Sequence, residues 1–119
     1  MKKTHKDLDV WNKAIELVKE IYTVTKFFPR EELYGLTSQM RRAAVSIPSN
    51  IAEGSARRTK KEYIQFLYIS LGSSTELETQ VIISEKLGFI LKEVHERMCL
   101  KIKKIKQMLF GLINALENK

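Results

Sequence analysis

The most restrictive feature of this sequence is an apolar repeat near its C-terminal end. Between residues 91 and 116 the apolar positions alternate spacings of four and three, which is the heptad pattern of helices that pack side by side in a left-handed bundle. The repeat consists of Leu91, His95, Met98, Ile102, Ile105, Leu109, Leu112 and Leu116. We expect His95 to be a satisfied residue near a bundle end, not a ligand or a base. This segment needs other helices against which it can bury the repeat.

Turn-forming residues are scarce elsewhere in the chain. The 119 residues include only five Gly and two Pro, so the chain must consist of few, long elements. Apolar spacings of three and four predict helices over residues 8–26, 37–54 and 60–87, in addition to the heptad segment. Four such helices with short links stack most simply as an all-α, up-down-up-down antiparallel four-helix bundle. We expect one such domain over residues 1–119.

Several residues mark where these helices begin, end or bend. Thr37 is the expected N-cap of the second helix, and Pro48 is expected to kink that helix without breaking it. Gly54 is the expected stop. Thr59 and Glu62 form the pattern of a capping box at the start of the third helix, and a C-terminal glycine, Gly88, is expected to end it.

The first and third helices carry more apolar surface than one bundle core needs. In the first helix, a row at Leu8, Trp11, Ile15, Val18 and Tyr22 lies beside a second row at Val10, Ala14, Leu17, Ile21 and Val24. Either this helix is wedged deeply into the bundle, or the second row meets another subunit. The third helix is apolar almost all round. Gly72 in its middle predicts a close approach of another backbone there.

The composition argues against several kinds of site. Cys99 is the only cysteine, and the two histidines, His5 and His95, lie far apart in the sequence, so neither a disulfide nor a metal centre is expected. No cofactor motif is present. The longest uncharged stretch, residues 63–75, is too short to cross a membrane, and no secretory signal follows the basic N-terminus. A cytoplasmic protein is the expectation.

A row of polar residues follows the second helix beside its apolar face. It consists of Gln39, Arg42, Ser46, Asn50, Glu53 and Arg57. This row is either an ordinary solvent face or an internally bonded one, and the second reading is favoured because serine and asparagine are poor helix-interior residues unless their side chains are bonded. If the second and third helices fold back on each other, Arg42 would face Glu76 or Glu78. We therefore interpret Arg41, Arg42, Glu76 and Glu78 first as architecture.

The formal net charge of +7 suits a polyanionic partner but also serves solubility. The basic residues form two clusters. The candidate phosphate contacts are Arg57, Arg58, Lys60 and Lys61 after the second helix, and Lys101, Lys103, Lys104 and Lys106 in the fourth. Taken alone, each cluster is more often a solvated face. Lysines hold phosphate without reading sequence.

Two stretches carry a resemblance to a known family. Residues 36–58, LTSQMRRAAVSIPSNIAEGSARR, and residues 62–80, EYIQFLYISLGSSTELETQ, resemble the 23S rRNA-intervening-sequence protein family. Its members are often labelled simply four helix bundle protein, and its superfamily includes accessory proteins of diversity-generating retroelements. The chain departs from the pattern at Ser55 and Ala56, where members commonly have an aromatic residue and a glycine.

The resemblance implies a bacterial four-helix bundle that assembles into a ring-like homopentamer. It implies no enzymatic activity, and nucleic-acid binding is the usual suggestion for the family. Three functions follow for this chain. The first is an oligomeric accessory protein that binds RNA or DNA, and the second is a protein-interaction scaffold. An enzyme such as a helical ribonuclease is not expected, because the sequence lacks a nucleophile with a base and an Arg followed closely by His.

Overall fold

The computed structural model describes residues 3–118. Within these residues the chain forms four α-helices and no strand, which confirms the predicted all-α class. The bounds are α1 Asp9–Thr25, α2 Leu36–Ser55, α3 Lys60–Lys86 and α4 Lys92–Glu117, with short 3₁₀ helices η1 His5–Asp7 and η2 Arg30–Glu32.

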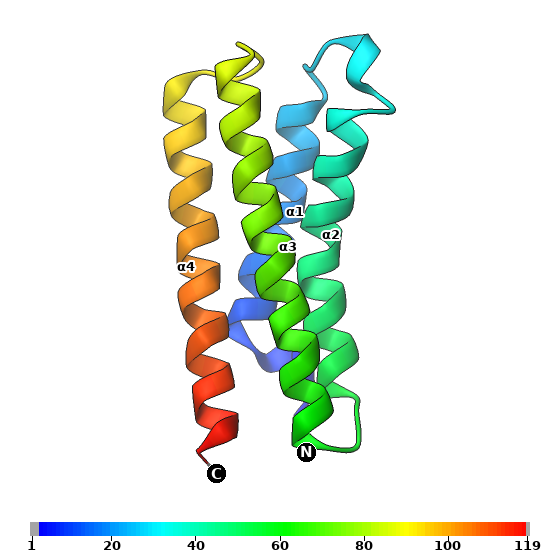
Figure 1. The fold of residues 1–119 in the computed structure, drawn as a ribbon, viewed down its shortest axis with the longest axis vertical. Helices are drawn as coiled ribbons and strands as arrows, with labels where there is room; N and C mark the ends of the chain where they lie inside the picture. Colours follow the sequence, from blue (N-terminus) through cyan, green and yellow to red (C-terminus); the bar gives the residue numbers. More distant parts are fainter. Residues whose placement is uncertain (1–2, 119) are drawn as a thin grey trace.

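Successive helices run in opposite directions along the long axis of the molecule (Figure 1). Each helix packs against the next one in the chain, and α1 also packs against α4. The described part of the chain measures 46 × 24 × 23 Å. This order of neighbours fits the predicted up-down-up-down arrangement.

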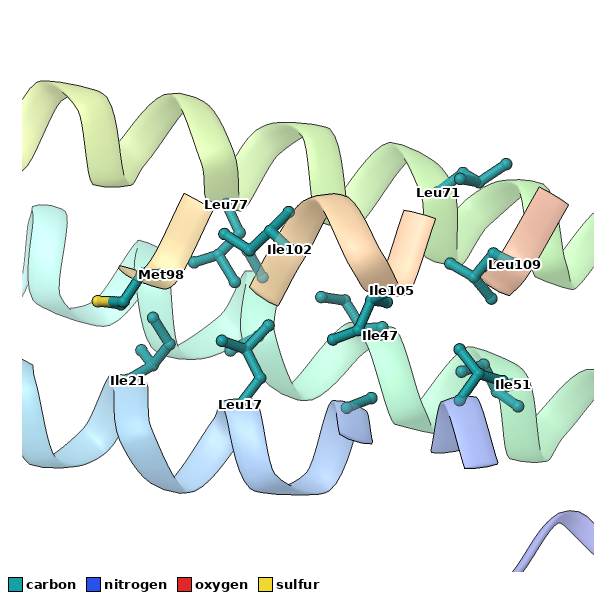
Figure 2. Packing of buried hydrophobic residues seen from close by; sticks show 14 of the residues in the cluster. Leu17, Ile21, Ile47, Ile51, Leu71, Leu77, Met98, Ile102, Ile105 and Leu109 are labelled. Atoms are coloured by element: carbon teal, nitrogen blue, oxygen red, sulfur yellow. The ribbon is translucent and has the colours of Figure 1, made fainter. Parts of the chain in front are cut away.

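The core is a continuous apolar column between the four helices. Figure 2 shows how side chains from all four helices point into it. The fully buried members of α4 are Met98, Ile102, Ile105, Leu109 and Ile113. The heptad prediction therefore holds over the middle of α4 but drifts toward Ile113 near its end, since a straight helix turns every 3.6 residues rather than every 3.5. Leu91 lies outside, at the N-cap.

Of the two interpretations of the apolar rows of α1, the one in which the second row meets another subunit is wrong. The second row is the core row, because Val10, Ala14, Leu17 and Ile21 are buried. In the first row, Leu8, Trp11 and Val18 are partly buried against the core, whereas Ile15 is 36% and Tyr22 41% exposed. The apolar surface left over for another contact is therefore this outer row.

α2 begins one residue before Thr37, which is buried inside the helix, so the predicted N-cap is wrong. Gly35 occupies the cap position, and the carboxylate of Glu32 accepts a hydrogen bond from the Leu36 amide at 3.2 Å. The helix continues through Pro48, as predicted. Since proline has no amide hydrogen, α2 tolerates one missing backbone bond at that turn.

The third helix begins and ends close to its predicted limits. The Thr59 hydroxyl accepts a hydrogen bond from the Glu62 amide and donates one to the Glu62 carboxylate. At the other end Gly88 has φ of +80°, and the Phe89 amide bonds back to the Ser84 carbonyl at 2.8 Å. This left-handed glycine closure is the predicted helix end.

Two glycines differ from their predictions within the single chain, and together they locate the closest contact between α2 and α3. Gly54 does not stop α2 but lies buried in its last turn. A Cβ there would stand 2.7 Å from the Cβ of Phe66 and 3.0 Å from Cδ1 of Tyr63 on α3. A Cβ at Gly72, by contrast, would meet no neighbouring group of the described chain within 4 Å. The close approach of α2 and α3 therefore occurs at Gly54.

Replacing Gly54 with alanine tests this contact. We expect Gly54→Ala to lower the free energy of unfolding by about 1–3 kcal/mol, because the new methyl group overlaps α3. Gly111→Ala on α4 is the matched control: its Cβ would meet no described neighbour within 4 Å, so it should raise stability by about 0.5–1 kcal/mol. Urea denaturation measures both. Equal stability of the two variants would contradict the contact.

Candidate functional site

The α2–α3 interface is held by short polar side chains. Ser46 and Ser73 share a hydrogen bond of 2.8 Å between their hydroxyl oxygens. Asn50 donates to the carbonyl and hydroxyl oxygens of Ser46, both at 2.8 Å. The buried Ser70 hydroxyl donates to the Ile47 carbonyl at 2.9 Å. At Ser46 and Asn50 the polar row is therefore internally bonded, as the favoured reading predicted.

Arg41 ties α1 to α2 from the outside. Its Nε donates to the buried Thr25 hydroxyl at 2.9 Å, and its guanidinium lies over the Tyr22 ring, 4.6 Å from the centroid. Thr25 in turn donates to the Ile21 carbonyl at 2.7 Å. Arg41 is thus architectural, as expected.

Arg42 behaves differently from the prediction. Within residues 3–118 it makes no hydrogen bond or ion pair, so the predicted pair with Glu76 or Glu78 is wrong for the single chain. The Glu78 carboxylate instead lies 3.5 Å from Lys106 Nζ on α4. Ser46 faces Ser73, so Arg42, one turn earlier on α2, lies level with the turn of α3 that carries Glu76. The two side chains form no ion pair in the described part of the chain.

Arg42 and Glu76 nevertheless share one surface feature. They line an open hollow of about 480 Å³ between the outer edges of α2 and α3. The other polar side chains of this hollow, which we call the α2–α3 hollow, are Tyr34, Ser38, Gln39, Ser46 and Ser73. Tyr34 is 94% exposed. The sequence pattern did not predict Tyr34 or Ser38, because the connection before α2 gives no periodic signal.

The turn between α2 and α3 carries the first basic cluster. Arg57 is already engaged: its Nη2 lies 2.8 Å from the Glu53 carboxylate, and its guanidinium lies 4.7 Å from the Phe66 ring centroid. Arg58 and Lys61 are exposed, and Lys60 is the first residue of α3.

The N-terminal segment adds basic residues to this end of the molecule. Lys3 and Lys6 line a second hollow together with Ser55 and Tyr63, near the same turn. The sequence analysis missed both lysines as candidates. The signal was present in the basic start of the chain, but nothing in the sequence places that segment beside the turn.

The second basic cluster, on α4, divides into bonded and unbonded lysines. Lys101 and Arg97 both bond the Glu20 carboxylate on α1, and Lys106 pairs with Glu78. Lys103 and Lys104 are exposed and have no partner within residues 3–118. These two are therefore the lysines of the cluster that are available to a ligand.

Glu20 is the main electrostatic link between α1 and α4. Its partial burial alone would raise its pKa, but the hydrogen bonds from Lys101 and Arg97 outweigh that effect. The pKa of Glu20 consequently lies below its ordinary value. The carboxylate stays ionised at neutral pH and fixes α4 against α1.

No group of His, Cys, Asp and Glu side chains that could hold a metal ion occurs within the described chain. The thiol of Cys99 is partly buried, and this burial together with the Glu78 charge raises its pKa, which lowers its reactivity. None of the helices between residues 3 and 118 is both long enough and apolar enough to span a membrane.

The fold and this surface define an all-α protein of four antiparallel helices with a basic α4. The family model for the 23S rRNA-intervening sequence protein matches residues 6–111, and the chain belongs to that family. This confirms the resemblance found in the sequence.

One solved structure shares the fold closely. It is a protein of unknown function from the S23 ribosomal protein family of Bacteroides thetaiotaomicron, with a TM-score of 0.82 and 24% identity over 88% of this chain and 95% of that one. Among curated proteins, none matches this chain.

The Glu20 link predicts a specific pH dependence. A carboxylate whose pKa is lowered by folding stabilises the folded state above its unfolded pKa, and this contribution disappears as the pH falls through the folded pKa. We expect Glu20→Gln to cost about 1 kcal/mol at pH 7 and much less in acid, once the pH has fallen through the lowered pKa of Glu20. Chemical denaturation across this range measures it. Glu16→Gln, on the same helix, is the control, and an equal loss at both pH values would contradict the assignment.

Replacing Arg41 should lower the stability of the fold, whereas replacing Arg42 should leave it almost unchanged. Arg41→Ala removes the Thr25 bond and the Tyr22 contact, so we expect a loss of about 1–2 kcal/mol in the free energy of unfolding. Arg42→Ala should change it by less than about 0.5 kcal/mol, as at a surface position without a partner. Thermal and urea unfolding compare the two. A stronger effect of Arg42→Ala would restore the ion pair that the sequence predicted.

Proposed function

We propose that this protein is a non-enzymatic, homo-oligomeric accessory protein that binds RNA or DNA through its basic surface. One observation carries the proposal: residues 97–116 of α4 contain five basic side chains and no acidic one. Such a strip attracts the phosphate backbone and releases counterions when it binds.

The lysines of α4 differ in whether they pair with a carboxylate, and we assign them different roles on that basis. Lys103 and Lys104 have no carboxylate partner within the described chain and are assigned to phosphate. Lys101 and Lys106 are held by Glu20 and Glu78, so they contribute to the local potential more than to direct contacts. Arg58 and Lys61 at the α2–α3 turn form a secondary contact. Such basic surfaces bind polyanions without making or breaking covalent bonds, so we assign the protein a non-enzymatic role. We place that role in the cytoplasm.

Self-association is the second part of the proposal. The outer row of α1, with Ile15 and Tyr22 exposed and Trp11 and Val18 half-buried, is an apolar strip on a small protein. Exposed apolar strips of this kind mark protein contacts. We assign this row to a contact between copies, in the ring-like homopentamer that the family resemblance implies. A ring would repeat the basic strip of α4 around one particle.

The same apolar surface favours an alternative. The protein could be an interaction scaffold that presents this row to a different protein, with the positive charge serving solubility. Tyr68 and Ile69, about half-exposed on α3, enlarge the apolar surface that such a scaffold would offer.

Charge reversal on α4 separates these functions. We expect Lys103→Glu with Lys104→Glu to lower affinity for a labelled RNA at least about tenfold at low salt. The slope of log affinity against log salt should become shallower by roughly one to two units per bound chain, since two phosphate contacts are lost. Fluorescence anisotropy across a salt series measures both quantities, and unfolding curves should stay unchanged.

Lys19→Glu with Lys26→Glu is the matched control, because it makes the same change in net charge on exposed parts of the chain outside α4. The control should keep most of the affinity. Equal losses in both variants would mean that only net charge matters. No measurable RNA or DNA binding by the unaltered protein would leave the scaffold as the better account.

A further inference from the structure

We propose that the α2–α3 hollow binds an unstacked guanine base of a single-stranded nucleic acid. This inference rests on the proposed nucleic-acid function and adds to it a site that distinguishes bases. Arg42, Glu76 and the exposed Tyr34 all line this hollow.

The charge balance of the hollow argues against phosphate as its ligand. One cation and one anion line it, and no ion pair joins them. A phosphate would be attracted by Arg42 but repelled by Glu76. A neutral ligand that presents both donors and acceptors fits this pair better, since it can bond both charged groups at once.

Among the bases, guanine matches this set best. Its Watson–Crick edge presents two adjacent donors, the N1–H and the N2 amine, which suit the two oxygens of the Glu76 carboxylate. Its O6 and N7 atoms are adjacent acceptors, which suit the fork of an arginine such as Arg42. Adenine, cytosine and uracil each lack the adjacent donor pair. The arrangement therefore favours guanine over the other bases.

Tyr34 supplies the stacking surface. It precedes Gly35 at the start of α2, and 94% of its accessible surface is exposed. Single-stranded nucleic acids are recognised by aromatic rings that stack on unpaired bases while polar groups read the base edges. An aromatic ring beside an arginine and a carboxylate has the parts that this mode of recognition requires.

The walls of the hollow are fixed by the polar bonds behind them. Ser46 and Ser73 bond each other across the helix interface. Gln80, which is buried, donates through Nε2 to the Glu76 carboxylate at 3.4 Å. A carboxylate held on one side by an amide keeps its other acceptor positions for a ligand. With about 480 Å³, the hollow has the size of pockets that bind small ligands.

The test uses nine-residue RNAs of uridine that differ only in the central base, which is guanine, inosine or adenine. We expect the guanine RNA to bind at least about fivefold more tightly than the adenine RNA. Inosine lacks the N2 amine and should lie between them. Fluorescence anisotropy at one fixed salt concentration measures all three, and the particle mass is determined in parallel.

Two pairs of variants locate the preference. Glu76→Gln should remove the guanine preference and leave the adenine affinity nearly unchanged, whereas Glu96→Gln, a matched change on α4, should keep the preference. Tyr34→Ala should weaken binding of all three RNAs about fivefold or more. Tyr68→Ala on α3, outside the hollow, should not.

The outcomes separate this inference from the proposed function. Salt-dependent RNA binding without any base preference would overturn the guanine site and leave the proposed function standing, whereas no binding of any RNA would overturn both. A preference that survives in Glu76→Gln would overturn the placement in the hollow. Loss of preference together with a lower particle mass would assign the hollow to a contact between copies, against the inference.

Discussion

The close approach of α2 and α3 is the constraint on which the rest of this structure depends. Gly54 leaves no room for a Cβ against Phe66, and the hydroxyl pair of Ser46 and Ser73 bridges the two helices. Small and short polar residues let the two backbones come together, and their hydroxyl groups bond across the interface. Arg42, a longer side chain of α2, lies outside this contact and is available to a ligand.

The contact between α1 and α4 is held by ion pairs rather than by small residues. There a single carboxylate, Glu20, holds two basic residues of α4, and the neighbouring Lys103 and Lys104 are left without acidic partners in the part of the chain that the structure describes. The basic residues that pair with Glu20 thus stabilise the fold, and the unpaired lysines remain available to a polyanion. The two sides suit different parts of one ligand, since a basic strip holds phosphates and a neutral polar hollow holds a base.

The sequence predicts the class, the four helices and most of the core, because apolar spacing directly reports which residues a helix buries. The sequence does not predict features that depend on how a residue packs against a neighbouring helix. Spacing cannot tell which row of α1 faces inward, and a glycine looks the same in sequence whether it packs closely, as at Gly54, or lies open, as at Gly72. The helix register brings Arg42 level with Glu76, but spacing cannot tell whether the two side chains pair. The basic residues were found, but their pairing, as in Lys101 with Glu20, follows from helix orientation alone.

The most direct measurement is to map where a bound nucleic acid touches the protein. A single-stranded RNA carrying photoreactive 6-thioguanine would be crosslinked to the intact protein, and the attached peptides identified by mass spectrometry. On this account, we expect crosslinks at Tyr34 and its neighbours in the α2–α3 hollow. Crosslinks confined to the outer row of α1, or none at saturating RNA, would contradict it.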